Sequence, residues 1–281
     1  MANNEKMGGY KFFRGFLGFI YKLWYNPTII GKENIPEDGP IVVVGNHINI
    51  MDQCNVIIST KRCIHYMAKK EYFDKKYKEG HFAWFFRAAG CIPVDRSIHD
   101  DDAKSSALEV LNNGYALGLF PEGTRNGLKD ATIKEIYDKY FVNKLTYNEL
   151  KKKINKCKKS QIDFLEEIML KNIISIDDYI NNIGDCNDYL VKLLLDNKIT
   201  EEEFYEHYLL PFKFGAVSMA YKTNSKIVPF VITGEYRFRS KDLMIRIGKP
   251  IDSMENLEEC NKLLRNYMIE LIKENHKNNG K

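Results

Sequence analysis

The stretch IVVVGNHINIMD, residues 41–52, decides how the rest of the chain is interpreted. Its opening apolar run is typical of a buried strand, and His47 and Asp52 follow the carboxyl end of that strand. Positions i and i+5 lie about 140° apart on one helix, so these side chains can meet only if His47 occupies the turn and Asp52 lies one turn into the next helix. An imidazole held by a carboxylate is a general base with a fixed tautomer. The alternative is chance, because such a pair arises in about a third of chains with six histidines.

The composition is that of a folded chain with an uneven charge distribution. Of its 281 residues 44% are hydrophobic and 28% charged, which suits one large domain or two small ones. Residues 128–210 hold 13 lysines and 16 acidic residues, so the net charge of +4 for the whole chain leaves +7 outside this segment. A basic body suits an anionic partner, such as a phosphate ligand, an anionic membrane or a nucleic acid.

The cysteine pattern and the first apolar stretch bear on the cellular compartment. The six cysteines show neither CxxC pairs nor zinc-ligand spacing, which predicts reduced thiols and no metal site. No small-residue cleavage site follows the first apolar stretch, so we expect no signal peptide. Both features predict a protein of the cytosol.

Residues 10–25, YKFFRGFLGFIYKLWY, predict an amphipathic helix. On a helical wheel an arc of about 160° is apolar, and it holds Phe12, Phe13, Phe16, Leu17, Phe19, Ile20, Leu23 and Trp24. The opposite arc holds Lys11, Arg14, Gly15, Gly18, Tyr21, Lys22 and Tyr25. The helix is about 24 Å long, less than the ~30 Å hydrocarbon core, so we expect residues 1–27 to lie in the membrane interface rather than span it. The alternative is a helix packed on the domain's own core.

Beyond residue 27 the pattern alternates between strands and helices. Apolar runs that end in glycine or polar residues predict strands at 41–44, 63–68, 115–120, 227–232 and 243–247, besides a short one within 28–35. Helical periodicity separates them at about 51–59, 83–88, 101–113 and 212–220, and a last helix follows at 255–275. This alternation predicts an α/β sandwich over residues 28–127 and 211–281, with its ligands at the carboxyl ends of the strands.

Residues 128–210 interrupt this alternation, with no proline and one glycine. Apolar residues at helical spacing predict an all-α insert of several short helices. Asp177 and Thr200 are the predicted N-caps, and Glu203 completes a capping box with Thr200. The lysine-rich run 151–159 indicates a solvated helix face, with docking of an acidic partner as the alternative. We identify no internal repeat.

Four stretches stand out because each ends a strand: NHINIMD (46–52), GCIPVDR (90–96), FPEGTR (120–125) and IVPFVITG (227–234). In order, spacing and residue identity they resemble the four motifs of the glycerophospholipid acyltransferase family, whose best-known members are lysophosphatidic acid acyltransferases. Further likeness lies in MAKKEYF (67–73), FKFGAVSMA (212–220) and IRIGKPI (245–251). Outside the insert, the resemblance covers most of residues 25–255. It implies an acyltransferase-type α/β sandwich with a mixed, mostly parallel sheet.

The resemblance implies transfer of a fatty acyl group from a thioester to the hydroxyl of a lysophospholipid, with lysophosphatidic acid as the leading acceptor and phosphatidic acid as the product. His47 would take the proton of the attacking hydroxyl, and Asp52 would orient His47. Arg96 and Arg125 suit the acceptor phosphate, because a guanidinium binds phosphate oxygens bidentately, and Glu122 would organise the acceptor site. The remaining substrate-binding candidates are Asn46, Gly123 and Thr124. No nucleophilic Ser or Cys is needed, so we expect direct transfer without an acyl-enzyme intermediate.

The partners implied are a membrane surface, a lysophospholipid and an acyl donor, either acyl-CoA or acyl carrier protein, with no cofactor and no nucleic acid. We expect a peripheral or monotopic protein on the cytoplasmic face of a membrane. Ile48 and Asn49 differ from the residues that the family usually has at these positions. This difference bears on the choice of acceptor more than on the chemistry. Glycerol 3-phosphate, another lysophospholipid or a lipid amine could replace lysophosphatidic acid as the acceptor. Two competing functions are thioester hydrolysis and a non-catalytic membrane adaptor whose insert docks a partner.

Overall fold

The computed structural model describes residues 8–279 apart from 75, 77, 96 and 99. The chain forms two compact units, Met1–Gly123 with Phe212–Lys281 and Thr124–Pro211. The predicted insert, 128–210, falls inside the second unit, which begins four residues earlier and ends one residue later.

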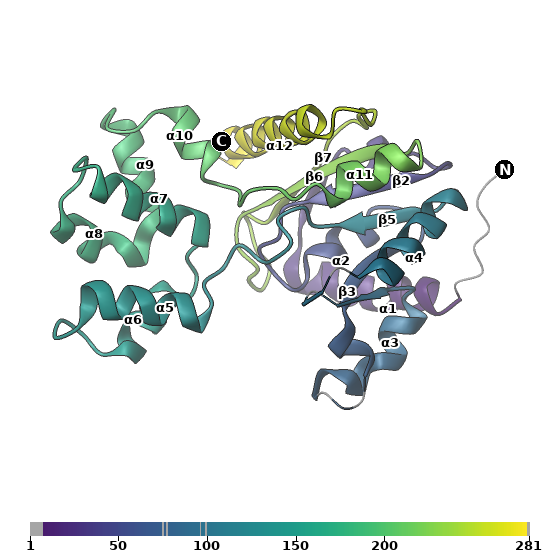
Figure 1. The fold of residues 1–281 in the computed structure, drawn as a ribbon, viewed down its shortest axis with the longest axis horizontal. Coiled ribbons are helices and arrows are strands. Elements are labelled where there is room, and N and C mark those ends of the chain that lie inside the picture. Colours follow the sequence, from purple (N-terminus) through teal and green to yellow (C-terminus); the bar gives the residue numbers. More distant parts are fainter. Residues whose placement is uncertain (1–7, 75, 77, 96, 99, 280–281) are drawn as a thin grey trace. The chain divides into compact units, whose positions relative to one another are not determined.

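A seven-stranded sheet forms the centre of the first unit, in the order β1-β7-β6-β2-β5-β3-β4 (Figure 1). The strands are β1 (Thr28–Ile30), β2 (Ile41–Gly45), β3 (Ile64–Lys69), β4 (Ile92–Val94), β5 (Ala116–Leu119), β6 (Lys226–Thr233) and β7 (Met244–Ile247). Neighbouring strands are parallel except β6 and β7, which are antiparallel. The prediction of an α/β fold with a mixed, mostly parallel sheet is confirmed.

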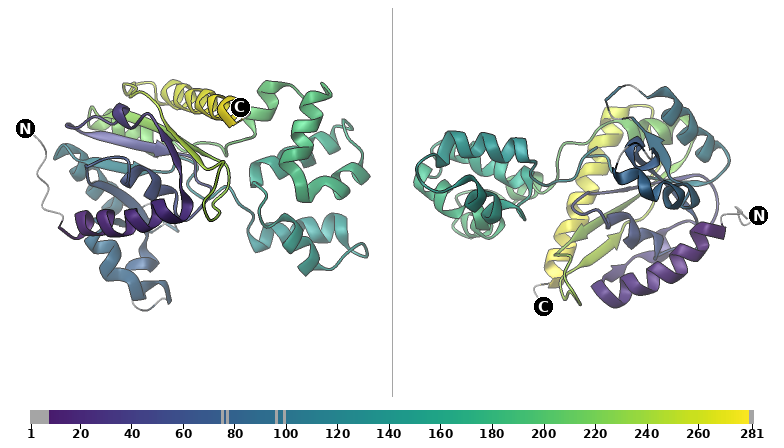
Figure 2. Two further views of the ribbon diagram at one scale, coloured as in Figure 1. Left: turned by 180° about the vertical axis from the view of Figure 1, so that it is seen from behind. Right: turned by 90° about the horizontal axis from the view of Figure 1, so that it is seen from below.

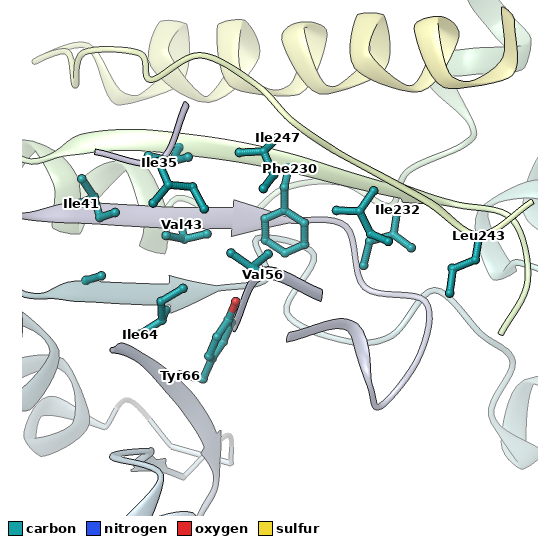
Figure 3. Close-up of a cluster of buried hydrophobic side chains, with 13 residues drawn as sticks. Ile35, Ile41, Val43, Val56, Ile64, Tyr66, Phe230, Ile232, Leu243 and Ile247 are labelled. Atoms are coloured by element: carbon teal, nitrogen blue, oxygen red, sulfur yellow. The ribbon is translucent and has the colours of Figure 1, made fainter. Parts of the chain in front are cut away.

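The central strand β2 contributes to both layers of the core, because all five of its residues are buried. Successive side chains of a strand point to opposite faces, so Ile41 and Val43 enter one layer while Val42 and Val44 enter the other. The first layer is a cluster of 13 buried apolar residues, which includes Val43 of β2 and Phe230 of β6 (Figure 3). Burial of each large apolar side chain contributes about 1.5–3 kcal/mol, which fixes the position of β2 between its neighbours.

Helices cover both faces of the sheet. They are α1 (Gly8–Tyr25), α2 (Asp52–Ile57), α3 (Ala83–Ala88), α4 (Asp101–Asn112), α11 (Gly215–Lys222) and α12 (Leu257–Asn279), with short 3-10 turns at η1 (Lys32–Asn34), η2 (Lys70–Phe73) and η3 (Lys78–Phe82). Helices α11 and α12 lie on one side of the sheet, and α1 and α2 lie on the other (Figures 1 and 2). Within the described part of the chain, no helix combines the length and the apolar character needed to cross a bilayer.

Helix α1 packs on the first unit through the arc that the sequence indicates to be polar. Gly18 is buried, and Arg14 donates hydrogen bonds to the carbonyl oxygens of Thr60 at 3.2 Å and Lys61 at 2.6 Å. Glycine suits this close approach, because a Cβ at position 18 would lie 3.0 Å from Cγ2 of Ile58. Most of the apolar arc stays exposed, at Phe12, Phe16, Leu17, Phe19, Ile20, Leu23 and Trp24. The apolar arc therefore does not pack on the domain's own core.

The second unit, residues 124–211, has entirely helical regular structure. Its helices are α5 (Asp130–Ile136), continued by a π turn η4 (Tyr137–Phe141), α6 (Tyr147–Ile154), α7 (Lys159–Leu170), α8 (Ile176–Asn182), followed by a 3-10 turn η5 (Ile183–Asp185), α9 (Cys186–Leu195) and α10 (Glu201–Glu206). Several apolar side chains fill its interior, among them the fully buried Phe141, Leu165 and Tyr179.

The second unit contains a repeat, so the prediction of no internal repeat is wrong. Three helices are followed by an asparagine with positive φ, at Asn143, Asn172 and Asn197. In each case a Thr or Ser three residues later starts the next helix with a capping box, at Thr146, Ser175 and Thr200. The repeats have unequal lengths, and their shared pattern, Asn-x-(Leu/Ile)-(Thr/Ser)-x-x-(Glu/Asp), is short, which hides it in the sequence. The unit consists of three helical hairpins with one kind of junction.

Of the two N-caps predicted in the insert, one is wrong and one is confirmed. The predicted N-cap Asp177 is wrong, because Ser175 caps α8, whereas the capping box of Thr200 and Glu203 is confirmed. The lysine-rich run is largely engaged within the unit: Lys151 pairs with Asp130 at 2.7 Å, for example. This engagement weakens the alternative that the run docks an acidic partner.

Candidate active site

Three neighbouring parallel strands, β5, β2 and β6, end at one edge of the sheet. The loops that follow them carry His47 after β2, Glu122 after β5 and Tyr236 after β6. Ligands of parallel sheets gather at this edge, because side chains of several loops meet there. The hydrogen bonds that join these loops define the site.

His47 and Asp52 form a hydrogen-bonded pair after β2. Nδ1 of His47 lies 2.8 Å from Oδ2 of Asp52, and the Asp52 side chain is fully buried. Asp52 is the first residue of α2, so the prediction that it lies one turn into the helix is wrong. The main chain instead curls around the carboxylate, and the N–H groups of Ile48 and Asn49 donate to Oδ2 at 2.6 and 2.8 Å. This turn brings together two side chains that could not face each other on a single helix.

The orientation of the His47 ring follows from its partners. A carboxylate only accepts hydrogen bonds, so we assign the proton of the neutral ring to Nδ1 and the lone pair to Nε2. Phe120 stacks on the imidazole, with ring centroids 4.1 Å apart and planes inclined by 12°. The His47 side chain is 15% exposed, so the ring is held on one side and reachable on another. Such an imidazole is arranged to act as a general base.

Glu122 ties the FPEGTR loop to the NHINIMD loop. Its side chain is buried, and Oε1 accepts a hydrogen bond from the main-chain N–H of His47 at 2.8 Å. Gly123 has a φ of +68°, and a Cβ there would lie 2.8 Å from Cε of Lys213. The turn therefore requires a glycine, because other residues rarely adopt this backbone conformation. These contacts give Glu122 and Gly123 a structural task besides their predicted part in the substrate site.

Asn46 joins the same loop to β6. Its Nδ2 donates to the carbonyl oxygen of Ile232 at 3.0 Å, and its Oδ1 accepts from the N–H of Ile232 at 2.8 Å. The side chain is 1% exposed and imitates the next rung of the β2–β6 ladder. Asn46 thereby holds His47 at the end of the strand.

Two residues that the sequence did not single out complete the surroundings of Asp52. The hydroxyl of Tyr236 donates to Oδ1 of Asp52 at 2.7 Å, and Nδ2 of Asn55 donates to the Tyr236 oxygen at 2.7 Å. Burial raises the pKa of Tyr236 well above its ordinary value, so the hydroxyl keeps its proton and can donate. The sequence carries little signal for either residue, since Tyr236 lies two positions beyond the IVPFVITG motif.

The predicted phosphate ligands are not among the described residues of the first unit. Arg96 lies outside the described residues, whereas Thr124 and the exposed Arg125 begin the second unit. Within the first unit, Lys70 after β3 pairs with Asp95 after β4. The hydrogen bond from Lys70 lowers the pKa of Asp95 to about 2. The sequence prediction missed Lys70 as a cation at this edge of the sheet.

The cysteines near the site are protonated. Burial raises the pKa of Cys54 to about 12 and that of Cys91 to about 11, so neither thiol is a nucleophilic thiolate near neutral pH. A groove of about 240 Å³ beside α1 is lined by Arg14, Gly15, Gly18, Phe19, Lys22 and Ile58. His47 and Asp52 do not line it.

Comparison with known proteins relates this geometry to a family. A family model described as Acyltransferase matches residues 26–233. A 1-acyl-sn-glycerol-3-phosphate acyltransferase of Bacillus subtilis is 31% identical over 126 residues, which cover 44% of this chain and 61% of that protein. Its namesake from Borreliella burgdorferi is 33% identical over 107 residues, which cover 37% of this chain and 41% of that protein. The chain thus matches about three fifths or less of the length of these relatives.

A solved structure shares the fold. The crystal structure of the 1-acyl-sn-glycerophosphate (LPA) acyltransferase PlsC from Thermotoga maritima superposes with a TM-score of 0.52. The match covers 93% of this chain and 80% of that chain, at 18% sequence identity. At this identity the likeness describes the arrangement of the elements and not the substrates.

Proposed function

The chain belongs to the acyltransferase family, and from this premise we propose that it transfers a fatty acyl group from a thioester to the free hydroxyl of a lysophospholipid. Lysophosphatidic acid is the proposed acceptor and phosphatidic acid the product, because the curated relatives are named for 1-acylglycerol-3-phosphate. The observation that carries the proposal is the 2.8 Å bond from Nδ1 of His47 to buried Asp52, which leaves Nε2 basic. No cofactor or metal is part of the proposal.

In the proposed reaction, Nε2 of His47 takes the proton of the acceptor hydroxyl as its oxygen attacks the thioester carbonyl carbon. The new carbon–oxygen bond replaces the carbon–sulfur bond, and the departing thiolate takes the proton from the imidazolium. Asp52 stabilises the imidazolium between these two steps through the proton on Nδ1. The protonated state of Cys54 and Cys91 supports direct transfer without an acyl-enzyme intermediate.

The proposed acceptor carries a phosphate, which calls for cations beside the reacting hydroxyl. We assign this task to Arg96 and Arg125, since a guanidinium fork matches phosphate oxygens and stays charged. Glu122 and Gly123 shape the same loop, and we retain them with Asn46 and Thr124 as substrate-site residues. The donor is acyl-CoA or acyl carrier protein, and both carry the acyl group as a thioester.

We propose that the protein binds a membrane from the cytoplasmic side through one surface, which we name the membrane face. It comprises the exposed apolar side chains of α1 together with Phe82, Trp84 and Phe238, which are 61–63% exposed. The ring of Phe13 packs 5.7 Å from that of Trp84, and the ring of Trp24 packs 5.0 Å from that of Phe238. An apolar surface that runs over three segments suits lipid, because large apolar patches are rare on surfaces that face only water.

The proposal is tested by incubating the purified protein with acyl-labelled donor and a panel of acceptors. The panel holds lysophosphatidic acid, glycerol 3-phosphate, a neutral monoacylglycerol and water alone, each with acyl-CoA and with acyl carrier protein. We expect label in phosphatidic acid, and about a hundredfold or greater loss in Asp52→Asn. Label found only as free fatty acid would indicate hydrolysis, and no transfer with any pair would refute the proposal.

The same panel tests the proposed phosphate contacts. Arg125→Ala should raise KM for lysophosphatidic acid and leave transfer to monoacylglycerol unchanged, whereas Arg125→Lys should keep part of the affinity. An equal loss with the charged and the neutral acceptor would remove Arg125 from the phosphate site. It would leave the reaction itself standing.

A further inference from the structure

We propose that Tyr236 is a positioning residue of the His47–Asp52 pair, and that a chain of hydrogen bonds from Tyr236 through Asn55 to Tyr21 ties helix α1 to that pair. The inference rests on the proposed function, because it assigns residues to the same proposed reaction. Neither the sequence motifs nor the comparisons single out these three residues.

The chain of bonds runs in one direction. The Tyr21 hydroxyl donates to Oδ1 of Asn55 at 2.7 Å, and Nδ2 of Asn55 donates to the Tyr236 oxygen at 2.7 Å. The Tyr236 hydroxyl then donates to Oδ1 of Asp52 at 2.7 Å, while Oδ2 of Asp52 faces Nδ1 of His47. Each member uses its donor toward Asp52, and bonds aligned in this way strengthen one another in a buried site.

Burial makes this chain hard to replace by water. Asp52 and Asn55 are 0% exposed and Tyr21 is 4% exposed. A buried carboxylate oxygen that loses its donor is left unsatisfied, which costs more than the bond itself contributes. Tyr236 therefore holds Oδ1 while the N–H groups of Ile48 and Asn49 hold Oδ2, and together these donors fix the direction in which Oδ2 meets His47.

Tyr21 connects this arrangement to α1. It lies on the buried side of the helix, beside Gly18, while the other side carries the exposed apolar residues of the membrane face. The hydroxyl oxygen of Tyr10, which is also buried, accepts a hydrogen bond from the N–H of Ile64 at 3.1 Å and adds a second fixed point. The position of α1 on the first unit is thereby coupled to the orientation of the Asp52 carboxylate.

The test compares Tyr236→Phe with Tyr25→Phe. Tyr25 lies in the same aromatic cluster, with its ring 5.4 Å from that of Tyr236 and 5.0 Å from that of Tyr21, but its hydroxyl is not part of the chain of bonds. Each variant loses one oxygen atom and keeps its ring. We expect Tyr236→Phe to lower kcat about tenfold or more with little change in KM for donor or acceptor. Tyr25→Phe should keep the kcat of the wild type.

Two further variants separate positioning from general weakening of the fold. Tyr21→Phe should lower kcat less than Tyr236→Phe, because it acts through Asn55. In a His47→Ala background, whose residual rate does not use the pair, adding Tyr236→Phe should change nothing. Thermal unfolding of all variants is measured alongside.

Each outcome decides between the inference and its premise. If Tyr236→Phe has the kcat of Tyr25→Phe while His47→Ala loses most of the rate of the wild type, the inference is overturned and the proposed function stands. An equal loss from Tyr236→Phe with and without His47 also overturns it, since the effect would not pass through the pair. If His47→Ala keeps the rate of the wild type, the proposed function itself fails.

Discussion

The main-chain N–H of His47 donates a hydrogen bond to Oε1 of Glu122 at 2.8 Å, although 75 residues separate the two in the chain. This bond joins the loops that follow β2 and β5, two strands that pair in parallel at the centre of the sheet. The carboxylate of Glu122 is thus turned toward the protein rather than toward an anionic substrate. The position of His47 depends on Glu122 behind it as well as on Asp52 beside it.

Replacement of Glu122 should therefore affect His47 before it affects substrate binding. Glu122→Ala leaves the N–H of His47 without its acceptor, which destabilises the fold by about 1–3 kcal/mol and lowers kcat. Glu122→Gln keeps an oxygen at the same place and should recover most of both quantities. Urea unfolding and initial rates measure these effects, and equal kcat values for the Ala and Gln variants would contradict this role.

The membrane face predicts a loss of vesicle binding from point substitutions. Phe16 and Phe19 are 58% and 69% exposed, so Phe16→Ser with Phe19→Ser should leave the fold intact. Full burial of each Phe in lipid contributes about 1.5–3 kcal/mol, so replacing both should weaken binding to anionic vesicles by about tenfold or more. Co-sedimentation measures it, with Leu195→Ser in the helical insert as an exposed apolar control. Unchanged binding of the double variant would remove α1 from the membrane contact.

The repeated junctions of the insert predict which residues cap its helices. Ser175→Ala removes the N-cap of α8 and should lower the free energy of unfolding of the insert by about 1 kcal/mol. Asp177→Ala, in the first turn of the same helix, should cost clearly less. The comparison is made by thermal unfolding of residues 124–211 expressed alone, which we expect to fold because they form a compact unit. A larger effect at Asp177 would contradict the capping assignment.

The pair of Lys70 and Asp95 predicts a pH dependence. Lys70 lowers the pKa of Asp95 from 3.8 to about 2 in the folded chain, so the pair stabilises the fold above about pH 4 and loses this contribution as the pH falls through 2. Lys70→Met should return the pKa of Asp95 toward 3.8, as followed by NMR titration of its carboxyl carbon. Lys69→Met at the adjacent exposed position is the control, and a low pKa retained in Lys70→Met would exclude this cause.

The sequence was a good guide wherever a pattern depends on neighbours in the chain. The apolar run before His47 predicts β2, and alternation of strands with helices predicts the mostly parallel sheet, because both follow from periodic burial. The capping box of Thr200 and Glu203 is equally local, since it lies within one helical turn. His47 and Asp52 are also close in sequence, so their meeting could be anticipated, although Asp52 is the first residue of α2 and not one turn into the helix.

Contacts between distant segments could not be predicted. Tyr236 reaches Asp52 across 184 positions, and no periodicity marks a tyrosine that donates one hydrogen bond. For a related reason the sequence left open whether the apolar arc of α1 faces a membrane interface or packs on the domain's own core. The helical wheel separates an apolar from a polar arc, but which arc packs depends on Gly18 meeting Ile58, a contact that is visible only in the fold.

The most direct test of the account is the initial rate of acyl transfer to lysophosphatidic acid in wild type and His47→Ala. Both proteins are assayed on vesicles with a labelled acyl thioester, after their thermal unfolding has been shown to be alike. General-base catalysis predicts a rate about 10²- to 10⁴-fold lower in His47→Ala. A rate within a few-fold of the wild type would show that His47 is not the base, and the central claim would then be contradicted.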